Sequence, residues 1–456
     1  MDNPTHQPLH CVAIVGGAVS GAEAAHQLSQ RGIEVVVFDQ ATLPYGKIED
    51  GLPKWHVKLR DKEEAAINEK IGHPLVRFVP NTRLGQDIGF TDLVQNWGFS
   101  AVLLANGAWK DRPLQIPGIE RFDGTGLYYQ NALSHWFNHY HEPGYNGKTF
   151  EIRDNAVIIG GGLASIDMAK LVMMELVQKA LAERSIKTDT LELERGIDKV
   201  LEKHDLKFED LGLKGCTLFY RRRKIDMPLT PSPTDTPEQL EKAQSVRVKV
   251  LENARSKFFF HFRECCVPVG LTEDNGHLTG IVFRETKPDG DRVVELEGSD
   301  FTFPTSLVIS SIGSIPEPIP GVPMDGQTYR IADPQCCRID GFEHVFALGN
   351  AVTGRGNIKE SFQHGRQISL RVMDDFLAGS SDDYEDVFRI KSNQANIGVD
   401  HLISFLDTST AISPEAYQAL SEKVKVRQQS VGYHGNYNQW VEEHLPVRLE
   451  KLTGHE

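Results

Sequence analysis

Residues 11–39 constrain the fold of this chain most strongly, because two short apolar runs flank a glycine turn and a helical pattern. Residues 12–15 are apolar throughout and end at two glycines, which is typical of a buried strand that enters a tight turn. The apolar spacing over residues 21–28 predicts a helix, and residues 33–38 predict a second buried strand. The stretch therefore predicts a strand–turn–helix–strand unit.

Five positions in this unit have the chemistry of a dinucleotide site. Gly16 permits the sharp turn, and Gly21 lets the helix pack close to the strand. Free N–H groups at the helix N-terminus can bind a pyrophosphate, although Ala18 places a methyl group at the usual second glycine. Asp39, followed by Gln40, ends the second strand about 20 residues on, where a carboxylate can accept hydrogen bonds from ribose hydroxyls. An ordinary strand–turn–helix without a ligand is the alternative.

A second stretch repeats the pattern from residue 155, with an apolar strand, a glycine turn and a helix. A charged insertion of helical pattern, residues 181–213, separates this helix from the partner strand, which comes at residues 215–220. The residues predicted to contact a second nucleotide are Gly160, Gly162, Leu163, Ala164 and Ser165. The sequence therefore predicts two nucleotide-binding units in one chain.

The two partner strands end in residues of opposite charge. The first ends in Asp39, which suits a free ribose 2′-hydroxyl and would repel a 2′-phosphate. The second leads into Arg221 and Arg222, and arginines bind a 2′-phosphate through paired, charge-assisted hydrogen bonds. We therefore predict FAD (or NAD) at the first site and NADPH at the second. A solvated charge run is the alternative for residues 221–224.

Composition narrows the class of protein. The chain has 456 residues, enough for two or three domains with large cores. It carries 63 acidic and 49 basic residues, and the net charge of −14 argues against nucleic acid or an anionic membrane as the main partner. No apolar run could span a bilayer, no signal peptide is evident, and six cysteines are too few for a disulfide framework. We expect a soluble, cytoplasmic protein.

Seven motifs in order resemble one known family. They are VGGAVSGAEAA, LPYGKIEDGLPKWH, LLANGAWKDRPLQIPG, IIGGGLASID, FYRRRKIDMP, VISSIG and ALGNAVTGRGNI. Together, over about residues 10–375, they resemble the FAD-dependent, NADPH-linked reductases of the adrenodoxin reductase type. The small subunit of glutamate synthase is a relative of that group.

The resemblance implies an α/β fold with two Rossmann-like dinucleotide-binding domains, one for FAD and one for NADPH. The FAD domain is expected to be split around the inserted NADPH domain. It would comprise residues 1–115 and 325–456, including a helical tail, and the NADPH domain would comprise residues 116–324. The resemblance further implies cofactor contacts from Gly107, Gly349, Asn350, Gly356, Asn357 and Ile358.

The implied reaction passes electrons from NADPH through FAD to an acceptor, with a ferredoxin-type iron–sulfur protein as the first candidate. His56 matches a family loop histidine near the flavin, and Asp167 matches a family position near the nicotinamide. A loop histidine without such a role and an aspartate that serves the helix dipole are the alternatives. The basic stretch 54–62 could dock an acidic partner or be a solvated helix start.

Other functions stay open at this point. The chain could be an electron-input subunit, a reductase or monooxygenase of a small molecule, or a redox-sensing flavoprotein with little turnover. A thiol-based mechanism is a rival, but cysteines 265–266 and 336–337 are adjacent pairs, and the other two lie in predicted buried strands. The oligomeric state is open.

The chain also departs from the family it resembles. Ala18 replaces the second glycine, Asn106 stands where threonine is usual, and Asn350 stands where many relatives have an aspartate. The cysteine-rich N-terminal segment that carries iron–sulfur clusters in glutamate synthase small subunits is missing. We therefore expect no metal or cluster in this chain.

Overall fold

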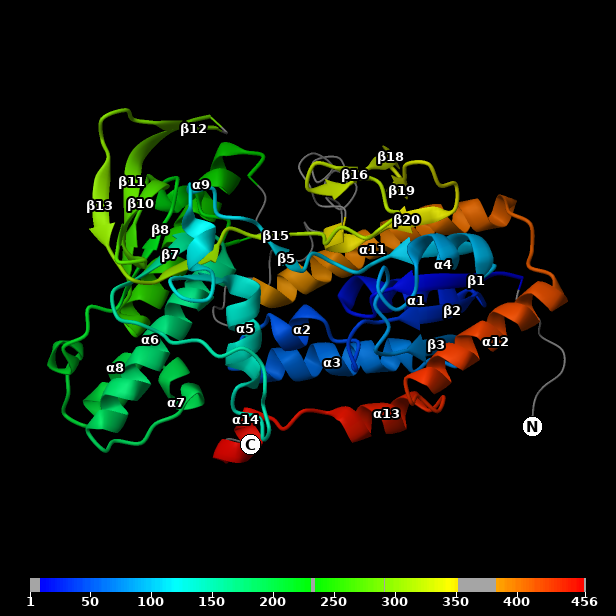
Figure 1. Cartoon of the computed structure of the whole chain (residues 1–456), viewed down its shortest axis with the longest axis horizontal. Helices are drawn as coiled ribbons and strands as arrows, with labels where there is room; N and C mark the ends of the chain where they lie inside the picture. Colours follow the sequence, from blue (N-terminus) through cyan, green and yellow to red (C-terminus); the bar gives the residue numbers. More distant parts are fainter. Residues whose placement is uncertain (1–8, 231–233, 291, 352–382, 455–456) are drawn as a thin grey trace. The chain divides into compact units, whose positions relative to one another are not determined.

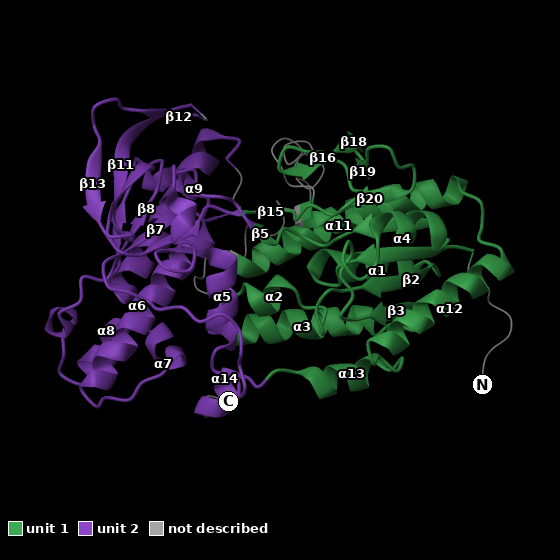
Figure 2. Cartoon of the chain, viewed as in Figure 1, with its two compact units in different colours: residues 1–52, 56–110, 314–446 green, residues 53–55, 111–313, 447–456 purple. Residues whose placement is uncertain are grey.

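The chain divides into two compact units (Figure 1, Figure 2). The structure, a computed structural model, describes residues 9–230, 234–290, 292–351 and 383–454. Unit 1 comprises residues 1–52, 56–110 and 314–446, and unit 2 comprises residues 53–55, 111–313 and 447–456. The sequence prediction assigned the whole tail to the first domain, whereas the last ten residues group with unit 2.

Unit 1 is built on a seven-stranded sheet with the strand order β18-β19-β20-β4-β1-β2-β3. The strands are β1 (Cys11–Val15), β2 (Glu34–Phe38), β3 (Val76–Val79), β4 (Ala101–Leu104), β18 (Ile331–Asp333), β19 (Arg338–Ile339) and β20 (Val345–Ala347). The five strands from β20 to β3 are parallel, so their carboxyl ends lie at one edge. Ligands of open α/β sheets bind at this edge.

Alternate residues of the central strand β1 point into two separate cores of unit 1. Val12 and Ile14 pack with helices α1 (Val19–Gln30), α3 (Val57–Ile71) and α11 (Asp383–Thr408). The other three residues of the strand pack with helices α4 (Phe90–Asn96) and α12 (Pro414–Ser430). Because both faces are covered, β1 and β2 are buried along their whole length.

Unit 2 contains a second parallel sheet with the order β6-β14-β7-β8-β9. Its strands are β6 (Leu127–Tyr129), β7 (Ala156–Gly160), β8 (Cys216–Phe219), β9 (His261–Arg263) and β14 (Val308–Ser311). Its helices include α5 (Gln130–His139), α6 (Leu163–Glu183), α7 (Thr190–Glu194), α8 (Ile197–Glu202), α9 (Pro237–Phe258) and α14 (Leu449–Thr453). The predicted second strand–turn–helix unit is therefore present as β7, α6 and β8.

An antiparallel sheet completes unit 2. It consists of β10 (Cys266–Asp274), β11 (His277–Asp289), β12 (Arg292–Glu295) and β13 (Phe301–Pro304). Asn275 and Gly276 join β10 to β11 and both have positive φ, as a tight two-residue hairpin turn requires. The rings of Phe219 and Phe283 stack with centroids 3.9 Å apart, so the two sheets of this unit share a core.

The remaining elements are short. They are α2 (Lys47–Asp50), α13 (Tyr437–His444), β5 (Lys110–Asp111), β15 (Ser314–Ile315), β16 (Met324–Asp325), β17 (Thr328–Tyr329), and the 3₁₀ turns η1 (Ile119–Phe122), η2 (Phe208–Leu211), η3 (Lys224–Asp226) and η4 (Gly349–Ala351). None of the helices that the structure describes is long and apolar enough to cross a lipid bilayer.

Two candidate nucleotide sites

The glycine turn after β1 admits no side chain at two of its positions. Gly16 has a φ of +99°, and a Cβ there would lie 2.6 Å from the carbonyl oxygen of Ala105. A Cβ at Gly21 would lie 1.8 Å from the carbonyl oxygen of Gly16. Helix α1 can therefore sit directly against the turn, as the sequence pattern predicts.

The N-terminus of α1 is open to a ligand. Ala18 is its N-cap and supplies no side-chain hydrogen bond, and its first turn contains no acidic residue. The first N–H groups of a helix have no partner within the helix and carry the positive end of its dipole. This end of α1 is therefore suited to an anion such as pyrophosphate.

Asp39 is buried beneath the glycine turn, with an exposed fraction of 6%. Its Oδ2 accepts a hydrogen bond from the N–H of Gly17 at 2.7 Å, and its Oδ1 accepts one from the N–H of Ala41 at 2.9 Å. Burial raises the pKa of Asp39 to about 6, against the lowering effect of the two N–H donors. Each carboxylate oxygen retains a lone pair, so a ribose hydroxyl could still donate to it.

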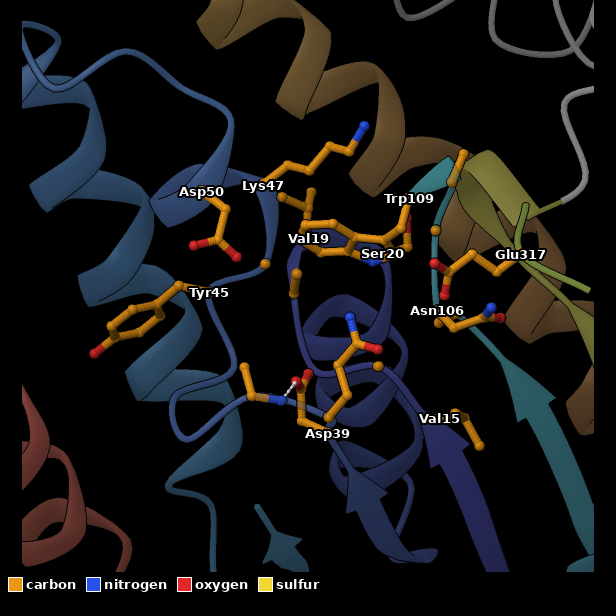
Figure 3. Close-up of a pocket in the computed structure, with 18 of the residues that line it drawn as sticks. Val15, Val19, Ser20, Asp39, Tyr45, Lys47, Asp50, Asn106, Trp109 and Glu317 are labelled. Carbon is orange, nitrogen blue, oxygen red and sulfur yellow. Dashed lines mark hydrogen bonds between the residues drawn. The ribbon is translucent and has the colours of Figure 1, made fainter. Parts of the chain in front are cut away.

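A cavity with an empty volume of about 1170 Å³, including its mouth, lies at the carboxyl ends of β1, β2 and β4 (Figure 3). Five of the predicted residues line it, namely Gly16, Ala18, Asp39, Gln40 and Gly107. Sequence reasoning missed other lining residues, among them Tyr45, Lys47, Asp50, Arg83, Trp109, Glu317 and Lys391. These come from loops, from α2 and from α11, which only the tertiary fold brings to the strand ends.

Gly349 also lies at this turn. It has a φ of +60°, and a Cβ there would come within 2.6 Å of the Oγ of Ser20, a residue that lines the cavity. The side chain of Asn350 is not described, and the predicted contacts at Gly356, Asn357 and Ile358 lie outside the described residues. Of the predicted cofactor contacts between residues 349 and 358, the structure therefore describes the side-chain surroundings of Gly349 alone.

Asn106 presents an unused acceptor in the cavity wall. Its Nδ2 donates to the hydroxyl of Tyr329 at 2.9 Å, and that hydroxyl donates to the carbonyl oxygen of Glu317 at 3.1 Å. Its Oδ1 is buried and accepts no hydrogen bond from the described residues. A buried carbonyl without a donor is costly, so this site fits a ligand that brings an N–H or O–H group.

The glycine turn of unit 2 has its own steric demands. A Cβ at Gly160 would lie 2.4 Å from the carbonyl oxygen of Ser311, and a Cβ at Gly161 would lie 2.1 Å from the ring of Tyr220. Gly162, by contrast, has open space around it. Ser165 donates its hydroxyl to the carbonyl oxygen of Gly162 at 2.6 Å, so its side chain has a hydrogen-bond partner within the turn. The turn and the N-terminus of α6 thus leave room for a phosphate group.

The arginines after β8 differ in their partners. Arg223 pairs with Asp226 at 2.9 Å. Arg222 donates to the carbonyl oxygen of Gly290 at 2.7 Å, and its Nε is buried with no hydrogen-bond partner among the described residues. Arg221 is exposed and makes no ion pair with a described residue. The two predicted phosphate ligands are therefore the two arginines without a carboxylate partner.

The two candidate catalytic residues lie in different units. His56 is the N-cap residue of α3 in unit 1, does not line the cavity, and packs edge-on against Tyr384 with ring centroids 5.4 Å apart. Asp167 is buried in α6 of unit 2, with its Oδ1 3.8 Å from the Nζ of Lys170. The pairing gives Asp167 a contact within its own helix.

The cysteines do not have the character of redox-active thiols. None of the six forms a disulfide. Burial raises the pKa of every thiol, to about 12 for Cys11, whereas reactive cysteines need a lowered pKa. The structure therefore does not favour the thiol-based mechanism that the sequence left open.

Comparisons with known proteins agree with this geometry. The profile of the pyridine nucleotide-disulphide oxidoreductase family matches residues 10–209. The mitochondrial NADPH:adrenodoxin oxidoreductase of Arabidopsis thaliana is 26% identical over 358 residues, which are 70% of this chain and 70% of that protein. The glutamate synthase [NADPH] small chain of Bacillus subtilis is 26% identical over 401 residues, 81% of this chain and 68% of that protein.

The fold also matches a solved structure. Mycobacterium tuberculosis FprA in complex with NADPH aligns with a TM-score of 0.67 at 20% identity, over 93% of this chain and 91% of that one. The predicted α/β dinucleotide-binding fold and the predicted resemblance to adrenodoxin reductase-type proteins are therefore confirmed.

Proposed function

We propose that this protein is an FAD-dependent NADPH oxidoreductase that passes electrons from NADPH through FAD to a ferredoxin-type iron–sulfur protein. The observation that carries the proposal is the contrast between the two strand ends. A buried carboxylate, Asp39, ends the unit 1 motif, and unpaired arginines follow the unit 2 motif. The named relatives, two of which are NADPH-dependent by name, support this assignment.

We assign FAD to unit 1. The FAD domain predicted from the sequence comprises residues 1–115 and 325–456. The glycine turn holds open the space for a pyrophosphate, and the Oδ1 of Asn106 offers an acceptor that lacks a donor. The residues proposed to hold FAD are Gly16, Ala18, Gly21, Asp39, Gln40, Gly107, Gly349, Asn350, Gly356, Asn357 and Ile358.

We assign NADPH to unit 2. The NADPH domain predicted from the sequence comprises residues 116–324. The open space at Gly162 and the N-terminus of α6 suit the pyrophosphate, and the arginines suit the 2′-phosphate. The residues proposed to hold NADPH are Gly160, Gly162, Leu163, Ala164, Ser165, Arg221 and Arg222.

The bound cofactors would supply the hydride and electron chemistry themselves. The chain's residues then have to bind, orient and shield them. In unit 1, Trp109 and Tyr45 give the cavity aromatic walls, and Arg83 and Glu317 form an ion pair at 2.6 Å among the lining residues. We retain His56 as a candidate for a polar contact or a proton, and Asp167 as a candidate for a nicotinamide contact.

A second candidate concerns the protein that receives the electrons. The similarity to a glutamate synthase small chain over 81% of this chain supports a second candidate, an electron-input subunit of a larger enzyme. A cytoplasmic location stays a prediction from composition.

The proposal is tested by nucleotide selectivity. In the flavin-bound enzyme, Arg221→Ala/Arg222→Ala should raise the KM for NADPH far more than the KM for NADH, because only NADPH carries the 2′-phosphate. Release of the bound flavin should yield FAD. Equal effects on the two nucleotides would contradict the assignment of unit 2.

A further inference from the structure

The positive charges around the end of β8 are only partly balanced. Arg223 pairs with Asp226, and Lys224 and Arg255 share Glu252, at 3.2 and 2.8 Å. Three arginines of this neighbourhood, Arg221, Arg222 and Arg247, make no ion pair with a described residue. A group of unbalanced cations in one place is a binding site for a multiply charged anion.

Arg247 reaches this place from a distant part of the chain. It lies in the middle of α9, and its Nη1 donates to the carbonyl oxygen of Ile225 at 3.0 Å. Its Nε is buried without a hydrogen-bond partner among the described residues, as is the Nε of Arg222. The Nε of Arg255 is buried without an acceptor as well, but Arg255 is paired with Glu252. Arg222 and Arg247 therefore combine a buried donor that lacks an acceptor with the absence of an ion pair to any described residue, and such donors are rare in folded proteins.

Tyr220 connects Arg247 to the glycine turn. Its hydroxyl donates to the carbonyl oxygen of Asp226 at 3.0 Å, next to the carbonyl that Arg247 binds. Its ring lies against Gly161. Burial raises the pKa of Tyr220, and the charges of Arg222, Arg221 and Arg247 all oppose that rise. All three arginines therefore lie close enough to the hydroxyl of Tyr220 to influence its pKa, and the ring of the same side chain touches the turn.

We propose that Arg247 is a third ligand of the 2′-phosphate of NADPH, together with Arg221 and Arg222. This inference rests on the proposed function and adds a specificity-determining residue to it. A phosphate monoester carries close to two negative charges near neutral pH, and its three outer oxygens can accept from all three guanidinium groups. The two buried Nε–H groups would then find acceptors on binding.

The test measures nucleotide binding as well as turnover. In the flavin-bound enzyme, Arg247→Met should weaken the binding of 2′,5′-ADP by about tenfold or more, as expected for the loss of a charged hydrogen bond. The affinity for 5′-AMP, which lacks the 2′-phosphate, should change less than about twofold. The KM values for NADPH and NADH should separate in the same way. Arg247→Lys keeps the charge without the planar fork and should lie between wild type and Arg247→Met.

Arg255→Gln is the matched control. It removes a cation from the same helix, but one that Glu252 already balances, so 2′,5′-ADP binding should be unchanged. If Arg247→Met does not fold, Arg247→Lys takes its place in the comparison.

The outcomes separate this inference from the function beneath it. Selective loss of 2′,5′-ADP and NADPH binding supports a three-arginine site. Suppose that Arg221→Ala/Arg222→Ala is selective, but Arg247→Met leaves the binding of 2′,5′-ADP unchanged or weakens the binding of 2′,5′-ADP and 5′-AMP equally. The inference is then overturned and the proposed function stands. If Arg221→Ala/Arg222→Ala is itself unselective, both are overturned.

Discussion

The methyl group of Ala18 faces the backbone of Gly46: a Cβ built at Gly46 would lie 2.8 Å from the Cβ of Ala18. Ala18 occupies the place where the sequence pattern expects a second glycine. The opposite wall of the turn has a glycine instead, with a φ of +53°. The departure at Ala18 is therefore accommodated by the loop that faces it.

A double-mutant cycle tests this accommodation. Gly46→Ala should weaken FAD binding and lower stability, because the added methyl meets Ala18 and because alanine is strained at positive φ. In an Ala18→Gly background the methyl contact is absent, so Gly46→Ala should have a smaller effect, which comes from the strained backbone alone. The measurement is the FAD dissociation constant of the four variants. Additive effects of the two substitutions would mean that the methyl contact carries no energy.

The stability of the flavin-free chain should fall as pH rises through about 6. Burial raises the pKa of Asp39 from 3.8 to about 6, so the folded chain holds a proton that the unfolded chain has already released. The contribution of this proton to the free energy of unfolding is fully present below about pH 4 and is lost as the pH rises through about 6. Urea unfolding of wild type and Asp39→Asn across this range measures it, and the variant should lack this slope. Bound FAD should flatten the wild-type slope, because ribose hydroxyls favour the ionised carboxylate.

Asn106 should be a selective determinant of flavin affinity. Asn106→Leu removes the buried acceptor and should raise the FAD dissociation constant by about tenfold, the expected cost of one buried hydrogen bond. Tyr329→Phe removes only the hydroxyl that Asn106 donates to, and should change it less. Flavin fluorescence titration of both variants makes the comparison. A larger effect of Tyr329→Phe would assign the energy to the Tyr329 contact instead.

The basic stretch 54–62 should not dock an acidic protein. The Nζ of Lys54 lies 4.2 and 3.9 Å from the ring centroids of Phe137 and Tyr140, and burial lowers its pKa to about 7. Arg60 is paired at 2.8 Å with Asp61, and Lys62 is paired with Glu385. The structure therefore favours the alternative that this stretch is the ordinary start of a helix.

Salt dependence and one lysine test that conclusion. Lys58 is the exposed cation of the stretch that makes no ion pair with a described residue. Lys58→Ala should change the rate of ferredoxin reduction by less than about twofold, as for an ordinary surface charge. Ferricyanide reduction is the control. A large loss with ferredoxin alone, together with a steep salt dependence that Lys58→Ala abolishes, would restore the docking role.

Local sequence was enough to predict the two strand–turn–helix units. At Gly16, Gly21 and Gly160 the reason is steric, since a Cβ at each would overlap backbone atoms. The continuous apolar runs predicted β1 and β7, because both faces of these strands are buried.

Sequence could not predict the groups that the tertiary fold delivers. Tyr329 reaches Asn106 from 223 residues away, and Glu385 neutralises Lys62 from 323 residues away. Arg247 has the sequence context of any solvated helical arginine, and only its contact with Ile225 brings it to the strand end. The one local signal was Asn106 itself, which departs from the family pattern.

The most direct test of the central claim is anaerobic stopped-flow spectroscopy of the purified protein mixed with NADPH, and separately with NADH. The account predicts a flavin-bound protein whose absorbance near 450 nm, a property of the oxidised cofactor, bleaches rapidly with NADPH and much more slowly with NADH. A protein without flavin, or a bound flavin that neither nucleotide reduces, would contradict it.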